Sequence, residues 1–400
     1  MPLDSRLTDH TRPQWVLHDA VDREHELSIG QVRAIALDAR LALAHATTAE
    51  PFVSLREMLL DRIDSGRLRG LDWFDADRAV VASNPRILHE RARSIVALGI
   101  PFYSRMPEKP TDTPRGRIAR YAWGGDYHRV FRKRMEEMVA RIEEVVGRPV
   151  ESRLLSDTAR IVDRAVAARS GLGWYGKHTC VIVPGYGSWV MLGEILLDVD
   201  IETTPSIDKN CGRCSICIDR CPTGAIVGPY VVDTPRCLSF QTIEQRGPIP
   251  AHLRSHLGDW VFGCDVCQDV CPYTGAAAEV IDADFAPRDI ENAFPALEWL
   301  LSMTEEEFRS MYQGTAVLRT KRRGLARNAA VVLGNDRSDV AAAALAKALA
   351  EHDEPLVRGH AAWGLAEIGG GSCRRALDRC LSAEVDEYVV SEIQDALHRL

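Results

Sequence analysis

The chain lacks the features that mark a membrane protein or a secreted protein. Its 400 residues contain no run of 18 apolar residues, so no segment is apolar enough for a transmembrane helix. The N-terminus reads Met-Pro-Leu-Asp-Ser-Arg and has no apolar core of a signal peptide. We therefore expect a cytoplasmic, reducing location and no membrane partner.

An excess of positive charge is also absent. The formal net charge is −8 at pH 7, which argues against a nucleic-acid footprint over the whole surface. Any such contact must be confined to a local basic segment. The length is enough for two or three domains with ample core.

Cysteine, in contrast, is concentrated in one stretch. Eight of the eleven cysteines lie between Cys211 and Cys271, first as C-x2-C-x2-C-x3-C-P and then as C-x2-C-x3-C-P after a lone upstream cysteine. This is the ligand spacing of a bacterial two-cluster [4Fe–4S] ferredoxin, in which the fourth cysteine of each run ligates the other cluster. Cluster one is assigned Cys211, Cys214, Cys217 and Cys271, and cluster two is assigned Cys221, Cys237, Cys264 and Cys267.

Two other interpretations of these cysteines stay open. Paired CxxC units also bind structural zinc, and cysteines at this density can form disulfides. The x2, x2, x3-Cys-Pro spacing and its second occurrence favour the clusters, and hence single-electron transfer. The remaining Cys180, Cys373 and Cys380 have no partner at ligand spacing, and we expect them to be small buried side chains.

Residues 50–200 read as an α+β domain. Apolar spacing predicts helices at 31–46, 55–68, 130–146 and 158–168. Short apolar runs predict strands at 94–99, 151–156, 180–184 and 189–197.

Two aspartates at expected junctions have alternative roles. Asp157 lies between a strand and a helix, where it can cap the helix for about 1 kcal/mol or face a pocket. Asp126 and His128 precede another helix, where both can be solvated cap residues. The residues alone do not decide between these roles.

The segment Gly171-Leu-Gly-Trp-Tyr-Gly176 matches the dinucleotide fingerprint G-x-G-x-x-G by letter only. That fingerprint must follow a strand and open a helix, whereas here a helix precedes it and a strand follows. We therefore expect the glycines to form a helix C-cap and a turn.

A basic segment opens the C-terminal part of the chain. No acidic residue occurs between Arg309 and Asp336, and the pattern at 328–333 recurs at 360–365, each time opening an Ala/Leu-rich helical pair. This predicts a short HEAT-like solenoid, with protein docking or phosphate contacts to RNA or DNA as alternatives. The candidate nucleic-acid contacts are Arg319, Lys321, Arg322, Arg323 and Arg327.

Taken together, residues 50–370 resemble the epoxyqueuosine reductases. The resemblance rests on Gly125-Asp-Tyr-His128, Asp157-Thr-Ala, Gly171 to His178, and Leu192-Gly-Glu194. It continues through the cysteine runs, Thr242-Ile-Glu244, Arg327-Asn-Ala-Ala and His360-Ala-Ala-Trp.

The resemblance implies reduction of the epoxide of epoxyqueuosine at the tRNA wobble base to the alkene of queuosine. Electrons from an external low-potential donor would pass through two [4Fe–4S] clusters to cob(II)alamin bound without its lower base, and Asp157 would be the proton donor. The chain has no Asp-x-His-x-x-Gly motif, because Phe131 stands where the glycine would be, which agrees with a cobalt that no protein histidine ligates. The expected cofactor contacts are Arg120, Asp126, Asp157, Val181, Leu192, Ser239, Asp265 and Val266.

The expected fold class is α+β in four parts. These are an N-terminal helical extension (1–50), a cobalamin-binding catalytic α+β domain (51–200), a ferredoxin-like two-cluster domain (201–285) and α-helical HEAT-like repeats (286–400). We expect a monomer. The alternative function is a corrinoid and iron–sulfur reductase of a small molecule, similar to the dehalogenases, which would not need the basic segment.

Overall fold

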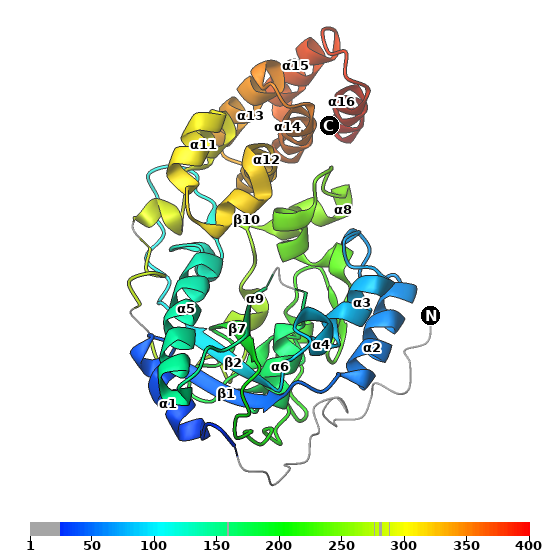
Figure 1. The fold of residues 1–400 in the computed structure, drawn as a ribbon. Coiled ribbons are helices and arrows are strands. Elements are labelled where there is room, and N and C mark those ends of the chain that lie inside the picture. The colour runs from blue at the N-terminus through cyan, green and yellow to red at the C-terminus, as the bar shows by residue number, and fades with distance from the viewer. Residues whose placement is uncertain (1–24, 158–159, 276, 280–281, 288) are drawn as a thin grey trace. The chain divides into compact units, whose positions relative to one another are not determined.

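The computed structural model describes residues 25–400 except 158–159, 276, 280–281 and 288. The chain forms two compact units, each built from several segments (Figure 1). The first unit comprises 25–104, 126–235 and 266–284, and the second comprises 105–125, 236–265 and 285–400. The cysteine-rich stretch is therefore shared between the two units, and the boundaries of the four predicted domains differ from this division.

A four-stranded antiparallel sheet is the centre of the first unit. Its order is β1 (Leu43–Thr48), β2 (Ser94–Pro101), β7 (Val190–Leu197) and β4 (Ser152–Leu155). Three of these strands confirm the predictions at 94–99, 189–197 and 151–156.

The predicted helix at 31–46 is wrong in its second half. Helix α1 spans Ile29–Asp38, and the backbone at Arg40 takes a positive φ of 59°, which ends the helix. Strand β1 then pairs along its whole length with the fully buried β2. Tertiary pairing overrides the helix propensity of this Ala/Leu-rich segment.

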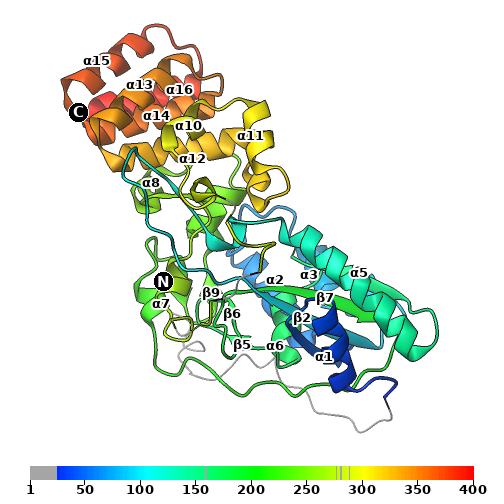
Figure 2. The ribbon, with the colours of Figure 1, turned by 90° about the vertical axis from the view of Figure 1, so that its left-hand side faces the viewer.

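Helices cover both faces of the sheet, as Figures 1 and 2 show. Helix α5 (Tyr127–Val146) packs on one face, where a side chain at Gly193 of β7 would meet Phe131 and Met135 within 3.0 Å. Helices α2 (Val53–Asp64) and α6 (Asp163–Arg169) contribute to a core with the alternate residues of β2 and β7 on the other face. Glu194 of β7 points to the α6 side by this alternation.

Short elements complete the first unit. They are α3 (Ala76–Ala82), α4 (Pro85–Leu88), β5 (Trp174–Tyr175), β6 (Val181–Ile182), α7 (Ile216–Asp219), β8 (Ile226–Gly228), β9 (Val231–Val232) and α9 (Val266–Asp269).

The G-x-G-x-x-G segment follows α6 and carries β5, so rejection of the dinucleotide site is confirmed. Gly171 has φ +70° and lies so close to Pro205 O that a side chain is excluded.

The second unit is mainly helical. A parallel pair, β3 (Arg117–Ile118) and β10 (Trp260–Phe262), shares one core with α10 (Leu297–Ser302) and the C-terminal helices. The other helices are α8 (Ala251–Arg254), α11 (Glu305–Tyr312), α12 (Lys321–Asp336), α13 (Asp339–Glu351), α14 (Pro355–Ile368), α15 (Gly370–Leu381) and α16 (Glu387–Arg399).

The repeated motif lies at equivalent places in α12 and α14. Gly334 and Gly364 let these two helices approach so closely that an added side chain at Gly334 would meet Gly364 Cα at 2.6 Å. The two helical pairs are observed, and their description as HEAT-like repeats stays a prediction. No helix among the described residues is long and apolar enough to cross a membrane.

Candidate active site and cluster-binding residues

Asp157 lies on the loop between β4 and α6 and does not cap a helix. Helix α6 begins only at Asp163, with Val162 at the N-cap position, so the capping interpretation is wrong. The Asp157 backbone has a positive φ of 43°, an uncommon conformation for a residue with a side chain. Its side chain is 53% exposed. Of the motif Asp157-Thr158-Ala159, the last two residues lie outside the described chain.

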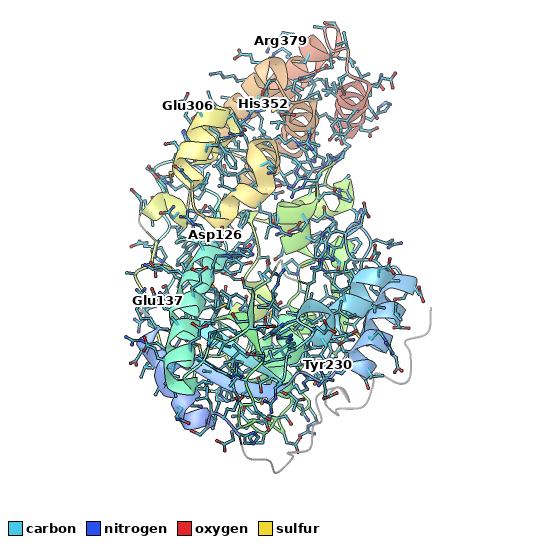
Figure 3. All side chains as sticks on the ribbon, in the orientation of Figure 1. Asp126, Glu137, Tyr230, Glu306, His352 and Arg379 are labelled. Atoms are coloured by element: carbon cyan, nitrogen blue, oxygen red, sulfur yellow. The ribbon has the colours of Figure 1, made fainter. Side chains whose placement is uncertain are left out.

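The neighbouring helix α5 supplies two partners for the Asp157 carboxylate. The Tyr127 hydroxyl donates to Asp157 Oδ2 at 2.7 Å. His128 Nε2 lies 3.5 Å from the same oxygen, and His128 Nδ1 lies 2.8 Å from Asp126 Oδ1. Asp126 also accepts from the His128 N–H at the start of α5, where Figure 3 labels it. The structure therefore joins Asp126 and Asp157 through one imidazole.

The charges in this group favour a protonated His128. Burial lowers the pKa of His128, but its contacts with Asp126 and Asp157 outweigh burial and raise it to about 9. The hydrogen bond from His128 lowers the pKa of Asp126 in return. At neutral pH an imidazolium stands between two carboxylates.

Two further acids lie behind the Asp157 loop, and motif spacing gave no reason to pair them. Asp163 Oδ1 accepts the Asp157 N–H at 2.9 Å. Burial, and then the charge of Asp157, raise the pKa of Asp163 to about 6. Glu194 is fully buried, and burial followed by the adjacent Asp163 raises its pKa well above the ordinary range. A protonated Glu194 beside Asp163 therefore supports the base of the loop.

The four predicted ligands of cluster one all belong to the first unit. Burial, and then the nearby Cys211, Cys271 and Cys214 thiols, together raise the pKa of Cys217 to about 12. Thiols that oppose one another's ionisation fit a site that bound iron would neutralise. Within the described residues, no three His, Cys, Asp or Glu side chains have the spacing for one metal ion. A cubane cluster is larger than a single ion, so its cysteines stand farther apart.

The predicted ligands of cluster two are divided between the units. Cys221 and Cys267 belong to the first unit, and Cys237 and Cys264 belong to the second. The Ala225 N–H donates to Cys221 Sγ at 3.2 Å, a backbone hydrogen bond that suits a thiolate ligand. Cys180, Cys373 and Cys380 were expected to be small buried side chains; Cys373 is buried, Cys380 is half-buried, and Cys180 is half-buried with a thiol that interacts with His178 and Cys267. That expectation is wrong for Cys180.

The remaining predicted cofactor contacts lie in varied surroundings. In the second unit, Asp265 Oδ2 accepts from both the backbone N–H and the guanidinium of Arg120 at 3.0 Å, and this ion pair is buried. Ser239 directly precedes the helical turn Phe240–Glu244. In the first unit, Val181 and Leu192 contribute to the core beside the sheet, and Val266 begins α9. Their contact with a corrin stays a prediction.

Some of the candidate nucleic-acid contacts are exposed cations, and the others already form ion pairs or hydrogen bonds within the protein. Lys321 and Arg323 are exposed at the start of α12. Arg319 pairs with Glu244, and Arg322 pairs with Asp353.

Arg327 has no exposed surface, because its guanidinium donates to the carbonyls of Gln241, Gln245 and Gly247. The prediction that Arg327 contacts nucleic acid is therefore wrong. A cation in a basic run here satisfies backbone carbonyls of its own unit.

Comparisons with known proteins agree with this geometry. A model described as "4Fe-4S double cluster binding domain" matches residues 210–274, and one described as "Epoxyqueuosine reductase QueG, DUF1730" matches residues 83–158. The chain is 32% identical over 357 residues to an epoxyqueuosine reductase of Bacillus subtilis, which covers 88% of this chain and 91% of that protein. It is 40% identical over 272 residues to one of Pseudomonas aeruginosa, which covers 68% and 74%.

Solved structures of that enzyme are similar over nearly the whole chain. An epoxyqueuosine reductase crystallised with an epoxyqueuosine-modified tRNA-Tyr stem loop superposes with a TM-score of 0.87 at 31% identity. The match covers 93% of this chain and 98% of that one. The structure from Streptococcus thermophilus has a TM-score of 0.84 at 28% identity and covers 92% and 98%.

Proposed function

Because this chain belongs to the epoxyqueuosine reductase family of oxidoreductases, we propose that it reduces the epoxide of epoxyqueuosine in tRNA to the alkene of queuosine. The reaction takes up two electrons and two protons and releases water. The relative crystallised with a modified tRNA stem loop supports tRNA as the substrate. We further propose a monomeric cytoplasmic enzyme that takes electrons from an external low-potential donor.

The observation that carries the catalytic proposal is the fixed Asp157 carboxylate. Asp157 is exposed enough to meet a substrate, yet Tyr127, His128 and the backbone bond to Asp163 hold its loop in a strained conformation. We assign the delivery of a proton to the opening epoxide oxygen to Asp157. His128 Nε2, 3.5 Å from Asp157 Oδ2 and protonated at neutral pH, would supply the proton that Asp157 passes on. A Bacillus subtilis relative is described with an aspartate-bearing catalytic loop swung out of its active site, which supports a loop acid.

The proposed cofactors are two [4Fe–4S] clusters and cobalamin. The cluster ligands are Cys211, Cys214, Cys217 and Cys271, with Cys221, Cys237, Cys264 and Cys267 for the second cluster. Both ring nitrogens of His128 face carboxylates, so the histidine nearest Asp157 is unsuited to ligate cobalt. This fits a cobalamin without a protein histidine ligand. When bound, the cobalamin would supply the nucleophile that opens the epoxide at carbon, and the clusters would supply its electrons.

Replacing Asp157 by asparagine tests the donor role. Asp157→Asn keeps the size of the side chain but removes its acidic proton. We expect about eight irons per chain and normal cobalamin binding, with turnover of the modified tRNA stem loop lower by about 10²–10⁴-fold. Asp77→Asn, a matched change on the exposed surface of α3, should leave turnover unchanged. Full turnover in Asp157→Asn would exclude Asp157 as the donor.

Binding of tRNA separates the proposal from a small-molecule reductase. Lys321 and Arg323 are the exposed cations of the basic segment, and we propose that they contact phosphates. The double variant Lys321→Ala, Arg323→Ala should weaken stem-loop binding and lower the salt slope by about 2. The double variant Lys347→Ala, Arg375→Ala changes equally exposed cations and serves as the control. Equal binding and equal salt slopes in the two variants would contradict the assigned surface.

A further inference from the structure

The segment from Gly171 to Cys180 contacts the ligands of cluster one and has no place in the epoxide chemistry. It belongs to the first unit, as do Cys211 and Cys271. Trp174 and Ile182 form a small apolar core with Cys271, against which Cys211 packs. The polar residues Lys177 and His178 lie on the same turn, and both are almost fully buried. Two buried polar side chains beside predicted iron ligands call for a chemical explanation.

The hydrogen bonds of His178 define its tautomer. The Cys180 N–H donates to His178 Nδ1 at 3.1 Å, so Nδ1 is an acceptor and the ring proton is on Nε2. Nε2 has no hydrogen-bond partner, sulfur included, within the part of the chain that the structure describes. The thiols of Cys180 and Cys271 are its neighbours. His178 therefore directs a buried N–H at a predicted cluster ligand.

The backbone is shaped to hold the ring in this place. A side chain added at Gly176 would meet His178 Cε1 at 2.6 Å and Nε2 at 2.9 Å. The imidazole thus lies directly against Gly176. The third glycine of the G-x-G-x-x-G segment is therefore needed to make room for the imidazole. Dinucleotide binding is not the reason for it.

A second set of donors surrounds Cys211. The Lys177 backbone N–H hydrogen-bonds the Cys211 thiol, and Lys177 Nζ donates to Gly212 O at 2.6 Å. Tyr230, labelled in Figure 3, donates its N–H to Lys177 O at 3.1 Å, and its backbone has a positive φ of 65°. Its hydroxyl group is buried, lacks a partner among the described residues and lies within electrostatic reach of Cys211. Hydrogen-bond donors of the 171–180 segment and of Tyr230 thus lie near two predicted ligands of cluster one, Cys211 and Cys271.

We propose that Lys177 and His178 are positioning residues for cluster one, and that the His178 Nε2–H, unpartnered among the described residues, would donate to Cys271 Sγ when the cluster is bound and raise the reduction potential of that cluster. A reduced cluster carries one more negative charge than an oxidised one, so N–H donors and a nearby cation stabilise the reduced form. When bound, cluster one would then be reduced more readily by an external one-electron donor. The donor loses one electron, the cluster gains it, and His178 keeps its proton. This inference rests only on the iron–sulfur part of the proposed function.

Two substitutions at His178 separate its two nitrogens. His178→Asn retains a group near the Nδ1 position that can accept the Cys180 N–H, but it cannot reach Cys271. His178→Gln places an amide N–H near the Nε2 position and should rescue the bond. His252→Asn, on the exposed surface of α8, is the matched control.

The measurement is a redox titration followed by EPR on each iron-reconstituted full-length protein, without substrate. We expect His178→Asn to shift the oxidation equilibrium of one cluster about tenfold toward the oxidised form, ~59 mV for one electron. His178→Gln and His252→Asn should match the parent. Unchanged potentials in a His178→Asn protein with about eight irons would overturn the proposal.

Pulsed EPR of the parent enzyme labelled with ¹⁵N-histidine provides a test that needs no variant to fold. An imidazole ¹⁵N coupling to the reduced cluster is expected, and its absence would overturn the proposal. Because neither measurement uses tRNA or an epoxide, a failure of the epoxide chemistry would leave both results unaffected.

Discussion

Two loops of the first unit hold their functional side chains in different ways. The Asp157 loop is half-exposed and is held largely by groups that titrate, namely His128 and Asp163. The His178 turn is buried and is held by a backbone N–H and by packing against Gly176. A proton-transfer site can depend on pH, whereas an electron-transfer site benefits from a constant environment. The contrast predicts that pH affects the first loop and that steric changes affect the second.

After replacement of Asp157 itself, the largest expected effect comes from removing the charge beside it. His128→Gln abolishes the imidazolium that faces Asp157, so we expect turnover of the modified tRNA to fall by about 10²-fold while the iron content is unchanged. His252→Gln controls for loss of a histidine elsewhere. Turnover equal to that of the parent would show that the contact between His128 and Asp157 is incidental.

The pH dependence of the parent sharpens this result. The pKa of His128 is raised from 6.5 to about 9 in the folded protein, so its ion pairs stabilise the fold fully below pH 6.5. That stabilisation is lost as the pH rises through 9. We expect the thermal unfolding midpoint of the parent to decline between pH 6.5 and 9 more steeply than that of His128→Gln. Parallel pH profiles would contradict the pairing.

A steric change should disturb the second loop. Gly176→Ala forces its Cβ into the His178 ring, and overpacking of this kind costs about 1–3 kcal/mol. The iron content should fall toward four per chain if the turn no longer supports cluster one. Gly228→Ala is the matched control, because no described atom lies within 4 Å of the added carbon. Equal iron content and stability in both variants would show that the turn tolerates displacement of the ring.

What the sequence could predict differs between these two loops for a physical reason. The cysteines follow from spacing, because a tight loop must present its thiolates at fixed intervals. Asp157 was identifiable by resemblance, but its link to His128 arises from tertiary contact between α5 and a distant loop.

The errors have a similar origin. Arg327 looked like a phosphate contact because a basic run gives no sign that three carbonyls of its own unit accept from one guanidinium. The strand at 43–48 depends in the same way on its partner β2. Local pattern therefore predicted the chemistry of the ligands better than it predicted which polar groups are buried.

The smallest expected effect concerns Glu194, the buried acid behind the Asp157 loop. Its pKa is raised well above 4.5 in the folded protein, so the unfolded chain releases this proton at lower pH than the folded chain does. The free energy of unfolding must then fall as the pH rises above 4.5. Glu194→Gln keeps the shape of the side chain and removes the titrating carboxyl group, so this loss of stability with rising pH should disappear. We expect the variant to gain stability relative to the parent between pH 5 and pH 8.

Thermal unfolding at pH 5 and at pH 8 measures this gain in stability. Turnover of the same variant shows whether Glu194 also takes part in proton transfer at Asp157. If Glu194 only supports the loop by packing beside Asp163, turnover should stay within a few-fold of the parent, because glutamine fills the same space. The contrast with Asp157→Asn would then separate the acid that meets the substrate from the acid that supports its loop. A variant that loses stability at pH 8 would instead show that Glu194 is ionised there, and that its charge is stabilised by its surroundings.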